Sequence, residues 1–161
     1  MWIAAISNTT DGLHSSVERF LGSMEIDWIF HCGNIGSNDV LVALSEHAPT
    51  TGVLGPNDDV GELPFGDNLV KTLEGCSIYM ASHIGSPIRP NEATAQAIDK
   101  HSPKVVFFAG EGPPSVDIIN GVVWVSPGNP TTDDQSCSVA VIELRGGHAY
   151  PEIIKLDAVV E

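Results

Sequence analysis

The sequence predicts the α/β class, with either one mixed sheet or a sandwich of two sheets flanked by helices. In the first half of the chain, apolar runs typical of buried strands alternate with amphipathic helix patterns. In the second half, most of the expected strands are joined in pairs by hairpin turns. The 161 residues, 42% of them hydrophobic, fit one domain with a substantial core, and we expect a single domain over residues 1–161.

The first half of the chain is expected to form strand, helix, strand, helix, strand. Residues 2–6 are almost continuously apolar, which is typical of a strand buried on both faces. A helix is expected over residues 13–24, because apolar residues recur there three and four positions apart. Residues 27–32 and 51–54 predict two more strands. The residues between them predict a second helix, with Asn38 as its candidate N-cap.

The second half of the chain carries three hairpin signals, one helix and one further strand. The strongest signal is Asn120-Gly121, because an Asn-Gly pair readily adopts the positive φ angles of a two-residue hairpin turn. A helix is expected over residues 91–100, followed by a buried strand at 105–108. The hairpins are expected at 68–73 with 77–81, at 116–119 with 122–125, and at 137–144 with 148–154.

The chain is strongly acidic. It has 21 Asp and Glu against 7 Lys and Arg, which gives a formal net charge of −14. A protein that binds a phosphate backbone or an anionic membrane surface needs clustered basic residues, and none cluster here. We therefore expect neither nucleic acid nor a membrane as a partner. The acid excess is typical of a well-solvated surface of the kind that is useful at high salt.

The three cysteines, Cys32, Cys76 and Cys137, are widely spaced and form no Cys-x-x-Cys pair. Their odd number and their spacing indicate neither a disulfide framework nor a structural zinc site. No apolar run approaches the roughly 20 residues that span a bilayer, and residues 1–6 lack the basic region of a signal peptide. We expect buried, reduced thiols in a cytoplasmic protein.

Short polar loops follow six of the expected strands. In open α/β sheets, ligands bind beyond the carboxyl ends of the strands, so these loops are the candidate site. We expect them to converge at one end of the molecule. They cover residues 7–12, 33–34, 55–59, 82–86, 109–114 and 126–130.

The contents of these loops resemble the motifs of the calcineurin-like metallophosphoesterase superfamily. The resemblance is to its compact bacterial and archaeal phosphodiesterases, a group that includes the phosphoesterase-fold retromer subunit, and it covers nearly the whole chain. Six motifs occur in the family's order: Ser7-Asn8-Thr9-Thr10-Asp11-Gly12 for S-D-x-H-G, His31-Cys32-Gly33-Asn34-Ile35 for H-x-G-D-I, Val53-Leu54-Gly55-Pro56-Asn57-Asp58 for V-x-G-N-x-D, Ser82-His83-Ile84-Gly85 for T-H-G-H, Ala109-Gly110-Glu111-Gly112 for G-H-T-H, and Val125-Ser126-Pro127-Gly128-Asn129 for I-N-P-G-S. The resemblance implies a four-layer α/β/β/α sandwich of two mixed sheets.

The metal-binding positions of the family are altered in this chain. In the family, two Asp, one Asn and several His hold two divalent metals that clamp the oxygens of a phosphoester. Here Asn8 and Asn34 stand where the family has Asp, and Thr10 stands where it has His. The Asn position falls on Pro56, and only His83 remains of the T-H-G-H and G-H-T-H histidines. By this resemblance, the fold is retained and the paired metal site is lost.

We therefore expect a non-catalytic family member that serves as a binding or scaffold module. The retromer subunit, a protein-binding scaffold, likewise carries Asn after Gly in its second motif. The expected partner is another protein or a second copy of the chain, with no catalytic residue and no cofactor. The vestigial metal positions are Asn8, Asn34, Asp58 and His83. The residues expected to line a binding site are Asn8, Thr10, Asn34, Asn57, Asp58 and His83.

Two alternatives stay open at this point. One is a metal-dependent phosphodiesterase or phosphatase with a reduced site that holds a single Mn, Mg or Ca ion and acts on a small phosphoester. The other is a small-ligand binder that uses the vacated cavity, where Ser, Thr and Asn side chains and backbone N–H groups suit a neutral or anionic ligand. The acidic loop residues Asp11, Asp58 and Asp59 suit a hard cation, although such residues are ordinary in turns.

The histidines outside the expected metal positions are expected to be of two kinds, buried and solvated. His31 ends an apolar strand and is interpreted as a core-edge histidine whose ring N–H is satisfied within the protein. The others outside the motifs are interpreted as solvated surface residues: His14, His47, His101 and His148.

Overall fold

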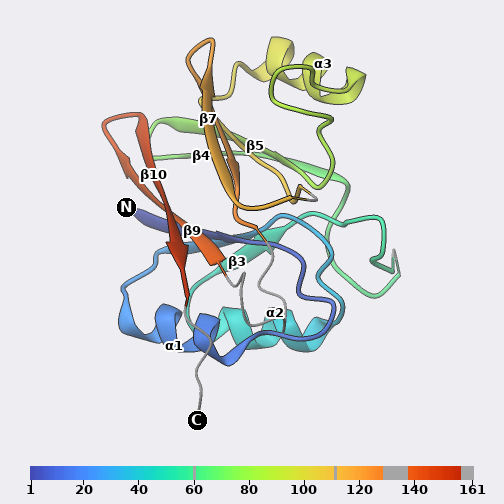
Figure 1. Cartoon of the computed structure of the whole chain (residues 1–161), viewed down its shortest axis with the longest axis vertical. Helices are drawn as coiled ribbons and strands as arrows, with labels where there is room; N and C mark the ends of the chain where they lie inside the picture. Colours follow the sequence, from blue (N-terminus) through green and yellow to red (C-terminus); the bar gives the residue numbers. More distant parts are fainter. Residues whose placement is uncertain (60, 111, 129–137, 157–161) are drawn as a thin grey trace.

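The computed structural model describes residues 1–59, 61–110, 112–128 and 138–156 of the chain (Figure 1). Its helices and strands follow the predicted order. The helices are α1 (Ser15–Ser23), α2 (Asn38–Ser45) and α3 (Glu92–His101). The strands are β1 (Trp2–Ile6), β2 (Trp28–His31), β3 (Thr50–Gly52), β4 (Asn68–Leu73), β5 (Cys76–Ala81), β6 (Val105–Phe107), β7 (Ser115–Ile119), β8 (Val122–Ser126), β9 (Ser138–Arg145) and β10 (His148–Lys155). Within the described part of the chain, no helix is both long and apolar enough to cross a membrane.

The first sheet joins strands from the two ends of the chain. Its order is β10-β9-β1-β2-β3. Strands β1, β2 and β3 are parallel, with Ile3 opposite Trp28 and Ile29 opposite Thr50. Strand β9 pairs antiparallel with β1 on the other side and continues into β10 through a hairpin. Because β1, β2 and β3 are parallel, the loops that follow them leave the sheet at the same edge.

The second sheet has the order β4-β5-β6-β8-β7. Strands β5, β6 and β8 are parallel, and the two outer strands, β4 and β7, are antiparallel to their neighbours. The turn between β7 and β8 is the predicted Asn120-Gly121, with φ angles of 52° and 77°. Both angles are positive, as a two-residue hairpin turn of this kind requires.

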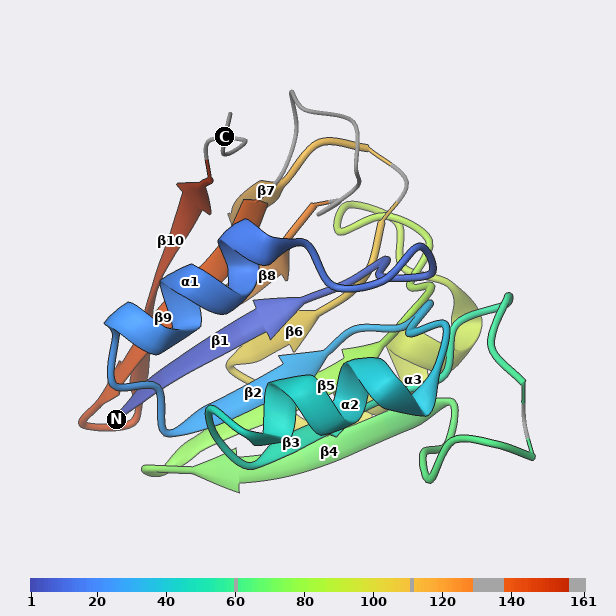
Figure 2. The same ribbon diagram turned by 90° about the horizontal axis from the view of Figure 1, so that it is seen from below.

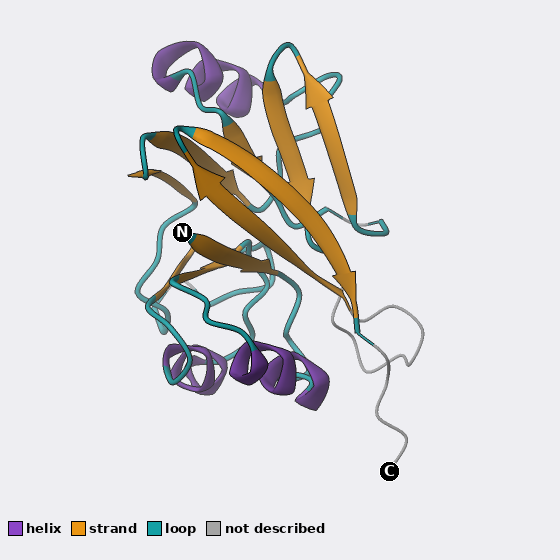
Figure 3. Ribbon diagram, turned by 90° about the vertical axis from the view of Figure 1, so that its left-hand side faces the viewer, coloured by secondary structure: helices purple, strands orange, loops and turns teal. Residues whose placement is uncertain are grey.

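The two sheets pack face to face, and helices cover their outer faces. Figures 1 and 3 show α1 and α2 on one side of the sandwich and α3 on the opposite side. Side chains alternate along β1: Ile3 and Ala5 belong to the core between the sheets, while Ala4 and Ile6 belong to the core beneath α1 and α2. Burial on both faces explains the continuous apolar pattern of this strand. The four-layer α/β/β/α sandwich is thus confirmed.

An aromatic pair joins the two sheets at the centre of the molecule. Phe30 of β2 and Phe107 of β6 are fully buried, with ring centroids 5.5 Å apart and planes inclined by 46°. Tilted ring pairs of this kind add about 0.5–1.5 kcal/mol beyond the burial of their area. The free thiols of Cys32 and Cys76 lie in the same core, as expected, and burial raises the pKa of the Cys32 thiol. Cys137 lies outside the described residues.

The N-cap predicted for α2 was wrong, and one histidine predicted to be a solvated surface residue has a structural role. Asn38 is the first residue of α2, and the N-cap is Ser37, which makes no side-chain cap bond. His14, expected to be a solvated residue, is the N-cap of α1: its Nδ1 accepts a 3.1 Å hydrogen bond from the Ser16 N–H. Because Ser, Thr, Asp and Asn are the usual N-caps, a search for those residues misses a histidine in this role.

Candidate functional site

The polar loops after the strands meet at one end of the sandwich, as expected. The arrows of β1 and β2 point toward this end in Figure 2. The loop after β1 is bonded to the loop after β8, because Ser7 Oγ donates to the Gly128 carbonyl over 2.7 Å. The loop after β6 is bonded to the loop after β5 through a 3.1 Å bond from the Ala109 N–H to the Ser82 carbonyl. We call this loop cluster the strand-end site; it comprises residues 7–10, 33–36, 55–59, 82–85, 109–110 and 126–128.

Asn8 and Asn34, which occupy the family's two aspartate positions, are hydrogen-bonded to each other. Each follows the end of a parallel strand in a left-handed backbone conformation, with φ of 59° and 58°. Asn adopts this conformation more readily than most residues. The two loops also exchange backbone bonds, from the Asn8 N–H to the Gly33 carbonyl and from the Thr9 N–H to the Asn34 carbonyl. The side chains are thereby brought together, and Asn34 Nδ2 donates to Asn8 Oδ1 over 2.9 Å.

The orientation of both amides is set by their other partners. Asn34 Oδ1 accepts a 3.3 Å bond from the Asn57 N–H, so Asn34 Nδ2 faces Asn8. The Asn8 amide directs its own Nδ2 to Ser7 Oγ at 3.3 Å. Ser7 is held in turn by the Gly128 carbonyl. One network of amide and hydroxyl groups therefore joins three of the predicted binding residues.

The Asp58 carboxylate binds two of the same loops to each other. Its Oδ2 accepts a 2.8 Å bond from the Gly55 N–H, and its Oδ1 accepts a 3.1 Å bond from the Gly36 N–H. The carboxylate thus ties the loop after β3 to the loop after β2. Gly55 also lies against Asn34, since a Cβ added there would overlap the Asn34 amide. Asp58 supports the backbone around the amide pair.

His31 lies buried at the end of β2, beside the loops that carry the amide pair, and is neutral. The Gly33 N–H donates to its Nδ1 over 3.2 Å, so this nitrogen carries no proton. Its Nε2 carries the proton and donates over 2.9 Å to Thr9 Oγ1, which donates to the Ile35 carbonyl. Burial lowers the pKa of His31 to about 4, against a smaller opposite effect of the Asp58 charge. The interpretation of His31 as a core-edge histidine with a satisfied ring is confirmed.

His83 lies at the rim of the strand-end site and is exposed. Its Nδ1 is 3.2 Å from Ser82 Oγ, and its carbonyl accepts a bond from Asn91 Nδ2 at the start of α3. His83 lines two hollows of about 290 and 270 Å³. The first is bounded by Phe108 and Gly110, and the second is bounded by residues of the loop after β3.

The donor atoms of the site do not fit the paired metals of the family. In the described residues, no group of three or more His, Cys, Asp and Glu side chains is placed to hold a metal ion. The loop acids Asp11, Asp58 and Asp59 therefore form no such group with one another or with other described residues. Asn8 and Asn34 offer neutral amides, bonded to each other, where the metals would need bridging carboxylates. No metal-dependent step follows from these residues.

Four of the six predicted binding residues are brought together. Asn8, Asn34 and Asn57 share one network, and Asp58 supports it through Gly55. The remaining two, Thr10 and His83, are exposed at its margin. The sequence interpretation did not predict that the buried hydroxyls of Ser7 and Thr9 hydrogen-bond the loops of the site to one another. Their position directly after a buried strand was the available signal, because such residues enter the sandwich with the strand.

A model of the calcineurin-like phosphoesterase superfamily domain matches residues 1–147. The chain belongs to this superfamily. No curated protein sequence matches it.

Solved structures with the superfamily fold match nearly the whole chain. Vps29 of Chaetomium thermophilum, complexed with a RaPID-derived cyclic peptide, has a TM-score of 0.71 at 16% identity, over 99% of this chain and 98% of that chain. Vps29 of Entamoeba histolytica, complexed with Zn²⁺, has a TM-score of 0.74 at 13% identity, over 96% and 99%. An archaeal phosphodiesterase has a TM-score of 0.72 at 15% identity, over 96% and 100%. At these identities the likeness establishes the fold alone.

Proposed function

We propose that this superfamily member is non-catalytic and acts as a binding module for a partner protein. The hydrogen bond from Asn34 to Asn8 is the observation that carries the proposal. The two amides stand at the family's aspartate positions, carry no charge and satisfy each other. To turn both toward a metal would break this bond and leave partly buried polar groups without their partners, which costs free energy.

Charge and the structural neighbours support a protein as the partner. The complex of Chaetomium thermophilum Vps29 with a cyclic peptide supports a peptide-binding role for this fold. The net charge of −14 argues against nucleic acid and anionic membrane as partners. The free buried thiols of Cys32 and Cys76 support a place of action in the reducing cytoplasm.

The proposal is tested by an assay for phosphodiester hydrolysis. The purified chain is incubated with Mn²⁺ and bis(4-nitrophenyl) phosphate, beside a metal-dependent phosphodiesterase of the same fold as a positive control. We expect no release of nitrophenol above the buffer rate. Turnover that depends on Mn²⁺ and disappears with a chelator would overturn the proposal.

A second candidate is a phosphodiesterase with a reduced site around His83. The two hollows that this exposed histidine lines favour it, and so does the archaeal phosphodiesterase among the structural neighbours. In that case His83→Ala would abolish turnover, whereas His101→Ala, a change at an exposed position at the end of α3, would leave it intact. Activity that survives His83→Ala would reject this candidate.

A further inference from the structure

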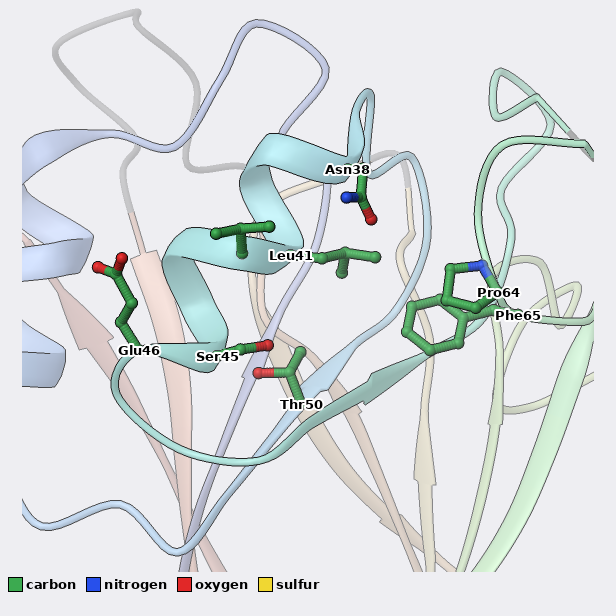
Figure 4. A pocket seen from close by; sticks show the side chains of 8 residues that line it. Asn38, Leu41, Ser45, Glu46, Thr50, Pro64 and Phe65 are labelled. Carbon is green, nitrogen blue, oxygen red and sulfur yellow. The ribbon is translucent and has the colours of Figure 1, made fainter.

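A groove of about 430 Å³ lies beside α2, outside the strand-end site. One wall is α2, and Pro64 and Phe65, which precede β4, form the other. Figure 4 shows Leu41 of α2 directed across the groove toward Pro64 and Phe65. Its volume lies within the range of about 300–1,000 Å³ that is usual for ligand pockets.

The groove presents apolar surface to solvent. Val42, on the exposed side of α2, has 53% of its surface exposed, although Leu41 and Leu44 beside it are buried. Pro64 is exposed and Phe65 is half-buried. An exposed apolar surface with a polar rim is typical of a protein interaction site. The polar rim comes from Asn38, Ser45, Glu46 and Thr50.

Phe65 and Gly66, on the loop side of the groove, are held against the chain at β3. Phe65 sits directly on β3, since a Cβ added at Gly52 would come 3.1 Å from its ring. The Leu54 N–H donates a 2.8 Å bond to the Gly66 carbonyl, which anchors the loop to the chain after β3. A preformed groove binds more tightly than one that must be ordered on binding, because less entropy is lost.

The charge that the groove itself carries is negative, and the chain around it is rich in acids. Residues 20–70 supply every lining residue, and this stretch of the sequence contains no Lys or Arg. It contains eight acids: Glu25, Asp27, Asp39, Glu46, Asp58, Asp59, Glu62 and Asp67. Among the described residues that line the groove, Glu46 is the charged one. A cationic partner is therefore attracted and an anionic one is repelled.

We propose that this groove docks a short segment of a partner protein that presents an apolar side chain flanked by Lys or Arg. The proposal rests on the proposed function of a binding module and adds the surface and the chemistry of the partner. The apolar side chain enters between Leu41 and Phe65, and the flanking cations are attracted by Glu46 at the rim and by the net negative charge of the chain. A second copy of the chain is a poor occupant, because two copies each carry a charge of −14.

Selection from a randomised peptide library against the full chain tests the proposal. Peptides are selected for binding to the unmodified protein. The affinity of each selected peptide is then measured for the Val42→Glu and the Ile118→Glu variants. Both positions are exposed, at 53% and 72%, but Ile118 lies on β7 of the other sheet. We expect recovered peptides to place Lys or Arg beside Leu, Phe or Met. Val42→Glu should weaken their binding about tenfold or more, Ile118→Glu should not, and added salt should weaken it.

Other outcomes would overturn the docking site. Recovered peptides that are acidic or neutral, peptides that bind Val42→Glu as tightly as the unmodified chain, or the recovery of no peptide would each do so. So would self-association that Val42→Glu abolishes, because the occupant would then be a second copy. Thermal melts of both variants check that each is folded. None of these measurements involves a metal or a phosphoester, so failure here is separate from turnover, which would overturn the proposed function.

Discussion

Asn34 donates from Nδ2 to Asn8 Oδ1 over 2.9 Å, and this bond has a fixed direction. The direction follows from the Asn57 N–H, which holds Asn34 Oδ1 and leaves Nδ2 to face Asn8. Asn34 is therefore the donor of the pair and Asn8 the acceptor. A carboxylate can replace the acceptor without loss of the bond, but it cannot replace the donor.

The two family-restoring substitutions should therefore differ in their effect on stability. Asn34→Asp removes the donor and sets a carboxylate oxygen against Asn8 Oδ1, so we expect it to lower the free energy of unfolding by about 1–3 kcal/mol. Asn8→Asp keeps an acceptor for Asn34 and loses the longer, 3.3 Å bond from Asn8 Nδ2 to Ser7 Oγ, so it should cost less. Asp tolerates the positive φ of these positions nearly as well as Asn, so backbone strain stays matched. Urea denaturation at pH 7 measures both, and an equal or larger loss for Asn8→Asp would contradict the direction of the bond.

Substitution of two glycines with similar backbone conformations tests the close approach of the loops after β1 and β2. Gly36 has φ of +95°, and a Cβ there would lie 2.8 Å from the Thr10 Cα. Gly12 has φ of +101° with open space around it. Gly12→Ala should cost only backbone strain, about 1 kcal/mol, whereas Gly36→Ala should cost about 1–3 kcal/mol more because the loops must separate. Thermal denaturation that finds the two variants equally stable would argue against this loop packing.

The free energy of unfolding should decrease as the pH is lowered from 6.5 to 4, because the buried His31 resists protonation in the folded chain. Its pKa is about 4 in the folded chain, against 6.5 when exposed, so the unfolded state binds more protons between these values. This histidine's contribution is full above pH 6.5 and declines as the pH falls toward 4, by about 3 kcal/mol at most. The free energy of unfolding is measured against pH for the unmodified chain and for His31→Gln, and the two slopes are compared. Parallel slopes, or an NMR titration of the His31 ring near pH 6.5, would contradict its burial as a neutral group.

Asp58 should act as a structural residue whether or not metal is present. Its two oxygens accept from Gly55 and Gly36, so Asp58→Asn loses one of these acceptors and should cost about 1–2 kcal/mol. The neighbouring Asp59 is exposed and accepts a longer bond of 3.3 Å, so Asp59→Asn should cost less. Melting temperatures measured with EDTA and with Mn²⁺ should show the same difference between the variants. A loss of stability in Asp58→Asn that appears only with Mn²⁺ would instead identify Asp58 as a metal ligand.

The architecture could be predicted from local patterns. Residues 2–6 are apolar throughout because β1 is buried on both faces, and Asn120-Gly121 specifies its turn through the backbone it prefers. The motif order then distinguished a sandwich of two sheets from one mixed sheet. His14 shows the limit of such patterns, because a histidine carries no general signal for a helix cap.

The contacts of the site could not be predicted in the same way. Asn8 and Asn34 are 26 positions apart in the sequence, and they meet because β1 and β2 pair with Ile6 opposite His31. Nothing in either loop specifies that register. Val42 illustrates the same limit for the groove beside α2, since an apolar residue in an amphipathic helix gives no sign of whether its face is covered.

The metal content of the protein purified without chelators tests the non-catalytic assignment most directly. After dialysis against Mn²⁺ and Zn²⁺ and removal of free ions, elemental analysis gives the number of ions retained per chain. We expect substoichiometric metal, unchanged in Asn8→Asp, because the amide pair and the surrounding donors supply no paired site. Retention of two ions per chain, with loss of both in His83→Ala, would contradict it.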